Sequence, residues 1–197
     1  MNTTTETPIC ISDYLHTALD PKRNRKAIKI ITQIITKTFG KDGFDAFAFM
    51  GMSGSLIVPT LCHILHKNMI MVRKDKDDSH SKMKVEGFIE ANKIIIIDDL
   101  ICSGSTLSTL ISKLIQLRKL YTPVLLQIVG IFLYHDSSVW KNTDISSYVN
   151  NDDIKNLLKN VPVYAFQISD WNGEIELHCS VPVQKILGVK RNQYIKL

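Results

Sequence analysis

The sequence predicts an α/β protein with a parallel twisted sheet that has helices on both faces. Strand-like and helix-like segments alternate along most of the 197 residues. The strand-like segments are apolar at consecutive positions, as in the run IIII at 94–97. Strands that are apolar on both faces are typical of parallel sheets covered on both sides. Ligands bind such sheets at the carboxyl ends of strands, so we expect functional residues after Met50, Val72, Ile97 and Tyr134.

The individual elements follow from apolar spacing and end signals. Residues 24–38 have helical spacing, and Gly40 marks the end of that helix. Pro59 lies in the first turn of a second helix, where a missing N–H group is tolerated. The polar residues 74–87 lack periodicity and predict an exposed loop. In chain order we predict helix 24–38, strand 44–50, helix 56–66, strand 69–72, strand 93–97, helix 105–120, strand 123–134, a short helix near 152–159 and strand 162–168.

Length and charge suggest a single domain that binds an acidic ligand. The chain is long enough to bury a core, which we place at about residues 24–168. A small variable hood is expected from residues 1–23 and/or 169–197. The net charge of +5 suits phosphate ligands but does not by itself indicate nucleic acid.

Cysteine usage and hydropathy predict a cytoplasmic protein. The four cysteines are far apart, without a CxxC pair or a zinc-like cluster, as expected for a reduced compartment. The segment MNTTTETPICISDY lacks the basic and apolar regions of a signal peptide. The longest apolar run, 124–134, is too short to span a membrane.

The strongest functional signal is IIIIDDLICSGST at 94–106. A strand buried on both faces delivers Asp98 and Asp99 to the carboxyl edge of the sheet. A small, hydroxyl-rich loop then opens a helix, whose backbone N–H groups and dipole favour an anion. Gly104 lets the backbone approach that anion closely. The loop residues are Cys102, Ser103, Gly104, Ser105 and Thr106.

Two carboxylates beside a phosphate would repel it unless they have another partner. Asp98 and Asp99 can accept hydrogen bonds from a sugar diol, or act through Mg²⁺. A plain helix cap with an exposed acidic turn is the simpler interpretation. The coincidence of both acids with the small-residue loop at the expected edge disfavours it.

Two further loops fit the same edge. Met52, Ser53, Gly54 and Ser55 follow Gly51 in a turn that alone indicates only a tight connection, but beside the first loop predicts a second phosphate site. After Val72 the chain carries cations, which form either a solvated loop or a lid over a polyphosphate leaving group. The cations we single out are Arg73, Lys74 and His80.

Other nucleotide and nucleophile motifs are absent from the sequence. A Walker-B interpretation of the aspartates needs a GxxxxGK[ST] loop, which the chain lacks. There is also no GxGxxG dinucleotide loop and no GxSxG nucleophile elbow.

IIIIDDLICSGST resembles the phosphoribosyl diphosphate (PRPP) binding motif of type I phosphoribosyltransferases, and the order of elements is similar over roughly residues 27–135. The resemblance implies that Asp98 and Asp99 hold the ribose hydroxyls and that residues 102–106 hold the 5-phosphate. It assigns Met52 to Ser55, with Arg73 and Lys74, to pyrophosphate. Residues 75–87, with His80, would form a catalytic flexible loop. Mg²⁺ would be bound by pyrophosphate and ribose oxygens, largely without protein ligands.

The implied activity is transfer of the phosphoribosyl group of PRPP to a nucleobase nitrogen, with release of pyrophosphate, in nucleotide salvage or synthesis. Members of the family are often homodimers, and nucleic acid and membranes are not expected partners. Two alternatives stay open: a PRPP-sensing regulator without catalysis, and a member that has lost activity. We prefer the enzyme because no helix-turn-helix appendage is evident and residues 1–23 are too short for a DNA-binding domain.

The base stays open between purine and pyrimidine. Cys102 stands where 6-oxopurine members of the family carry an aspartate, which weakens a hypoxanthine–guanine assignment. RKDKDDSHS at 73–81 is loosely similar to the loop of orotate members, whereas HSKMKVEG echoes purine-type members. Trp171 is as suited to packing against the core as to stacking on a base.

Overall fold

The computed structural model describes residues 12, 14–74, 83–121, 125–135, 144–168, 175–179 and 193–195. The described strands form an eight-stranded sheet in the order β3-β2-β1-β4-β5-β6-β7-β8. Strands β2, β1, β4, β5 and β6 run parallel, and β3, β7 and β8 run antiparallel to their neighbours. The strands are β1 (Ala46–Met50), β2 (Asn68–Val72), β3 (Val85–Gly87), β4 (Lys93–Asp98), β5 (Gln127–Leu133), β6 (Val163–Ile168), β7 (Ile175–Cys179) and β8 (Gln193–Ile195).

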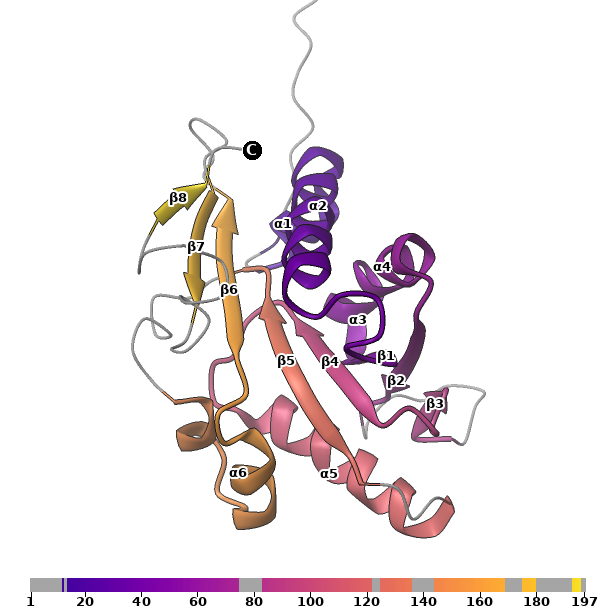
Figure 1. The fold of residues 1–197 in the computed structure, drawn as a ribbon. Coiled ribbons are helices and arrows are strands. Elements are labelled where there is room, and N and C mark those ends of the chain that lie inside the picture. Colours follow the sequence, from indigo (N-terminus) through magenta and orange to yellow (C-terminus); the bar gives the residue numbers. More distant parts are fainter. Residues whose placement is uncertain are drawn as a thin grey trace, which may run out of the picture.

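Helices cover both faces of this sheet, which confirms the predicted fold class (Figure 1). One face carries α1 (His16–Leu19), α2 (Pro21–Thr38), the short α3 (Gly51–Ser55) and α4 (Val58–Leu65). The other face carries α5 (Ser105–Tyr121), the 3₁₀ helix η2 (Ile145–Tyr148) and α6 (Asp152–Leu158). No helix in the described ranges is long and apolar enough to cross a membrane.

The central strand β4 belongs to both cores. Ile94 and Ile96 lie in the core under α5 and α6, and Ile95 and Ile97 lie in the core under α2 and α4. Successive side chains of a strand point to opposite faces, so an unbroken isoleucine run is what a sheet covered on both sides requires. The buried strand therefore ends with Asp98 at the carboxyl edge of the sheet.

Helix α2 begins at Pro21 rather than at residue 24. Its start is defined by Asp20, whose carboxylate accepts the N–H groups of Lys22 and Arg23 at 2.8 Å each. Proline at the first helical position adds no unsatisfied donor. Within the segment 1–23, where a hood is expected, α1 packs onto α2 and buries Ala18 in the core.

The prediction of a loop throughout 74–87 is wrong for Val85–Gly87. These residues form the edge strand β3, which pairs antiparallel with β2. Val85 is buried in the core, and the Arg73 side chain forms an ion pair with Glu86. A single buried valine in a polar run gave too weak a strand signal. Residues 75–82, including His80, lie outside the described residues, as does Trp171.

Other boundaries also differ from the prediction, most clearly in two places. Strand β5 spans Gln127–Leu133 rather than 123–134. The predicted helix 56–66 corresponds to α4, and the turn before it is itself the helix α3, Gly51–Ser55. Boundaries shift because backbone pairing, not hydrophobicity, decides where an element ends.

Candidate active site

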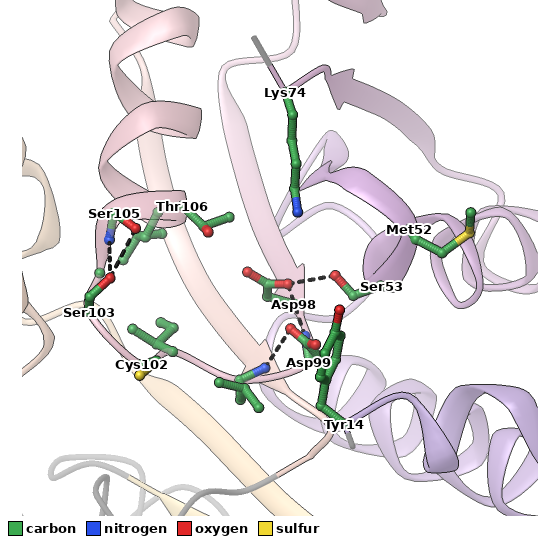
Figure 2. Close-up of a pocket in the computed structure, with 14 residues that line it drawn as sticks. Tyr14, Met52, Ser53, Lys74, Asp98, Asp99, Cys102, Ser103, Ser105 and Thr106 are labelled. Atoms are coloured by element: carbon green, nitrogen blue, oxygen red, sulfur yellow. Dashed lines mark hydrogen bonds between the residues drawn. The ribbon is translucent and has the colours of Figure 1, made fainter. Parts of the chain in front are cut away.

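A cavity of about 210 Å³ lies at the carboxyl edge of the sheet, between α3 and the loop that leads into α5 (Figure 2). It is lined by Met52 and Ser53 of α3, by Lys74, by both aspartates after the isoleucine run, and by the loop residues 100–107. Tyr14, from the segment before α1, completes the lining. The structure therefore brings together three loops that the sequence placed at one edge.

Asp98 and Asp99 are held in place by hydrogen bonds. Both are buried, with 8% of each residue exposed. The Ser53 hydroxyl donates to Asp98 Oδ1 at 2.8 Å, and the backbone N–H of Asp99 donates to the same atom at 3.0 Å. The N–H of Leu100 donates to Asp99 Oδ1 at 2.8 Å. The two acids are thus oriented at the cavity before any ligand binds.

Burial raises the pKa of Asp98 to about 8, with a further rise from the neighbouring Asp99 carboxyl group. The hydrogen bonds from Ser53 and from the Asp99 backbone oppose this rise. Near neutral pH the pair therefore carries less than two full negative charges in the ligand-free protein. Hydroxyl donors or a cation entering the cavity favour the ionised form.

The loop before α5 has the shape of an anion site. Gly104 has φ of +70°, and a Cβ atom there would lie 2.3 Å from the carbonyl oxygen of Tyr148 in η2. Only glycine fits this turn without displacing η2. The hydroxyls of Ser103 and Ser105 are 2.9 Å apart at the start of the helix. With Cys102 and Thr106 they surround the cavity at the positive end of the helix dipole.

Helix α3 forms the opposite wall and passes closely over β1. A Cβ atom on Gly54 would lie 2.2 Å from Phe49 Cβ, so glycine is needed for this approach. Gly54 is buried and Ser55 donates its hydroxyl to the carbonyl of Gly51 at 2.9 Å. Of the four residues predicted here, Met52 and Ser53 line the cavity, whereas Gly54 and Ser55 shape the turn.

The two predicted cations after β2 have different surroundings. Lys74 lines the cavity, and Figure 2 shows its ammonium group directed toward the aspartates. Arg73 instead donates from Nε to Glu86 Oε1 at 2.8 Å, and its carbonyl accepts a bond from Lys113 at 2.8 Å. Arg73 is not among the residues that line the cavity. Lys74 is therefore the better-placed cation.

Two tyrosines at the site were not predicted. Tyr14 is 47% exposed and stands beside Asp99 in Figure 2. Nothing in the sequence distinguished it within the expected hood segment 1–23. Tyr134 is fully buried at 0% exposure and donates its hydroxyl to the carbonyl of Ser53 at 2.9 Å. Its position at the end of a predicted strand was the only signal that could have found it.

The donor set suits Mg²⁺ only with help from a ligand. In the described part of the chain, no group of three or more histidine, cysteine, aspartate or glutamate side chains is placed to hold a metal ion. Asp98 and Asp99 nevertheless offer two adjacent carboxyl groups at the cavity. Mg²⁺ favours oxygen ligands and often completes its shell with substrate phosphates. The residues therefore fit an ion held mainly by a bound phosphate compound.

No family model matches the sequence, and no curated protein matches it. Among solved structures, the chain is similar to adenine phosphoribosyltransferase from Saccharomyces cerevisiae, complexed with D-2,5-dideoxy-2,5-imino-altritol 1,6-bisphosphate and adenine. That match has a TM-score of 0.51 and 19% identity, and covers 75% of this chain and 86% of that one.

Two orotate phosphoribosyltransferases match less well. The enzyme from Mycobacterium tuberculosis, in complex with inorganic phosphate, has a TM-score of 0.44 and 12% identity over 62% of each chain. The enzyme from Aeropyrum pernix has a TM-score of 0.46 and 13% identity, over 62% of this chain and 64% of that one. Both matches span less than two thirds of those enzymes. The strand order, the helices on both faces and the likeness to the yeast enzyme show that this chain has the type I phosphoribosyltransferase fold.

Proposed function

We propose that the protein transfers the 5-phosphoribosyl group of PRPP to a nucleobase nitrogen and releases pyrophosphate. The observation that carries this proposal is one cavity with three complementary parts: two buried acids, a hydroxyl-rich loop at a helix start, and a lysine on the far side. A sugar diol, a terminal phosphate and a diphosphate need these three kinds of partner. The fold supports the proposal, and the residues that line the cavity indicate PRPP as the ligand.

Each part of the cavity has a binding role. Asp98 and Asp99 accept hydrogen bonds from the two ribose hydroxyls. The backbone N–H groups and hydroxyls of residues 102–106 bind the 5-phosphate. Met52 and Ser53 border the space for the diphosphate, and Lys74 contributes positive charge to it. Arg73 and His80, also proposed for catalysis from the sequence, stay predictions.

The chemistry follows from the charges. The bond from the anomeric carbon to the diphosphate oxygen breaks as the bond to the base nitrogen forms, through an oxocarbenium-like transition state. The carboxylates of Asp98 and Asp99 lie beside the positive ribose ring and stabilise it. Lys74 stabilises the negative charge on the leaving diphosphate. Asp98 and Asp99, together with the diphosphate oxygens, would hold Mg²⁺, which would supply further positive charge against the leaving diphosphate.

The test is pyrophosphate release from PRPP with Mg²⁺, measured against adenine, guanine, hypoxanthine, xanthine, uracil and orotate. We expect turnover with one of these bases. PRPP binding without turnover, lost when both aspartates are replaced by asparagine, would instead identify a PRPP-binding regulator. Absence of both binding and turnover would contradict the proposal. A cytoplasmic location and a homodimer belong to the same proposal.

PRPP is expected to protect Cys102 from alkylation. Cys102 is exposed and lines the cavity. At a PRPP concentration about ten times Kd, the rate of its modification by N-ethylmaleimide should fall about tenfold, because only ligand-free molecules react. Mass spectrometry of the Cys102 peptide measures that rate.

Cys62 serves as the internal control for this experiment. It is half-buried, and burial raises its thiol pKa to about 11, which keeps it poorly reactive. Its modification rate should not change with PRPP. Equal Cys102 rates with and without PRPP, once calorimetry has shown that PRPP binds, would place the phosphate loop elsewhere.

A further inference from the structure

Tyr134 follows β5 directly and contacts two walls of the cavity, the end of β4 and helix α3. Its backbone N–H donates to the carbonyl of Asp98 at 3.2 Å. Its hydroxyl donates to the carbonyl of Ser53 at 2.9 Å. One fully buried residue, directly after β5, therefore links the end of β4 to α3.

These contacts close a ring of hydrogen bonds. Ser53 returns to Asp98 through its hydroxyl, which donates to Asp98 Oδ1 at 2.8 Å. Tyr134, Ser53 and Asp98 thus each contact the other two. Helix α3 spans only Gly51–Ser55, and so short a helix is not stable by itself. Its position depends on contacts of this kind.

The hydroxyl of Tyr134 has a specific purpose, because a phenylalanine would fill the same core space. A buried hydroxyl costs free energy unless it finds a partner. The carbonyl of Ser53 supplies that partner for the Tyr134 hydroxyl.

We infer that Tyr134 is a positioning residue that holds α3 at the geometry needed for the diphosphate of PRPP. It acts through Ser53 and does not itself line the cavity. This inference rests on the proposed function, since it names the residue that aligns the diphosphate wall with the ribose-binding acids. Within the described part of the chain, the bond to the Ser53 carbonyl is the contact that a phenylalanine at this position would lose.

The substitution Tyr134→Phe removes the hydrogen bond and keeps the ring. We expect the KM for PRPP to rise about three- to tenfold, the size typical of one hydrogen bond, with the KM for the base unchanged. The backbone amides of residues 51–57 should also exchange hydrogen faster than in the wild type. 4-Aminophenylalanine at position 134 restores a donor and should return both values toward wild type.

Tyr164→Phe is the matched control. Tyr164 is another fully buried tyrosine of the same core, on β6, and its ring stacks on Phe132 with centroids 4.5 Å apart. Its loss of a hydroxyl should leave the KM for PRPP and exchange in α3 unchanged. If Tyr134→Phe does not fold, 4-fluorophenylalanine at the same position removes the donor with less loss of polarity.

The outcomes separate this inference from the proposed function. A wild type that uses PRPP, with an unchanged KM in Tyr134→Phe, would overturn the positioning role. So would an unchanged exchange rate in α3, even if both tyrosine variants lost equal stability. If the wild type neither binds nor consumes PRPP, the proposed function fails, and the exchange measurement alone decides whether Tyr134 positions α3.

Discussion

Replacing Asp98 and Asp99 together by asparagine is expected to lower turnover at least about a hundredfold, the usual cost of losing charge stabilisation at a transition state. The amides keep the shape of the carboxyl groups, and the position-98 amide oxygen still accepts a bond from Ser53. They carry no negative charge to place beside the positive ribose ring. Pyrophosphate release measures the loss of turnover, and calorimetry with PRPP measures any loss of PRPP affinity.

Asp98→Asn alone is expected to stabilise the ligand-free protein at neutral pH. The pKa of Asp98 is raised in the folded state from 3.8 to about 8, so between these values the folded protein holds a proton that the unfolded chain has released. The free energy of unfolding of the wild type therefore falls as pH rises through this window. Asparagine does not titrate, so the advantage of the variant should be larger at about pH 8 than at about pH 5, as measured by urea unfolding.

Asp153→Asn is the control for both measurements. Asp153 is exposed in the first turn of α6 and does not line the cavity. Its loss should leave turnover unchanged and alter stability only slightly. Near-wild-type turnover in the double aspartate variant would remove these acids from the mechanism. A stability difference independent of pH would contradict the raised pKa.

Gly104→Ala should damage both the fold and the phosphate loop. The residue has φ of +70°, which an L side chain adopts only with strain, and the new Cβ would lie 2.3 Å from Tyr148 O. The loop or η2 must therefore move. We expect a loss of about 2–4 kcal/mol in the free energy of unfolding, since strain and overpacking add. PRPP affinity should fall at least about tenfold, because a shift of the loop misplaces several of its backbone N–H donors at once.

Gly40→Ala separates strain from collision. Gly40 has φ of +63°, but a Cβ atom there would meet nothing within 4 Å. This variant should lose only about 1 kcal/mol, from backbone strain, and should bind PRPP as the wild type does. If Gly104→Ala behaves like Gly40→Ala in urea unfolding and calorimetry, the contact with η2 does not constrain the loop.

The sheet and the acidic edge could be predicted because their signals are local. The isoleucine run identifies a strand covered on both faces, and Asp98 and Asp99 follow it directly, so their place needs no knowledge of the rest of the chain. Gly104 is similar: a small loop before an amphipathic helix already indicates a close backbone approach. These features depend on few, neighbouring residues.

The contacts that the sequence did not reveal all join distant segments. The ion pair of Arg73 with Glu86 depends on the pairing of β3 with β2. A single valine in a polar stretch does not predict that pairing. Tyr14 reaches the cavity only because α1 packs onto α2. Tertiary packing decides each of these.

The isoleucine run of β4 cannot by itself fix the alignment of that strand. Sliding β4 by one position would replace each isoleucine with another, and both faces would stay apolar. Only the ends would change: one direction would carry the exposed Lys93 into the core, and the other would carry Asp98 to the fully buried place of Ile97. A buried ammonium group in the first place, or a carboxyl group without hydrogen-bond partners in the second, is costly. The acid proposed to bind ribose therefore also acts as a stop that prevents strand slippage, so its replacement by an apolar residue would threaten the alignment of the sheet as well as the chemistry.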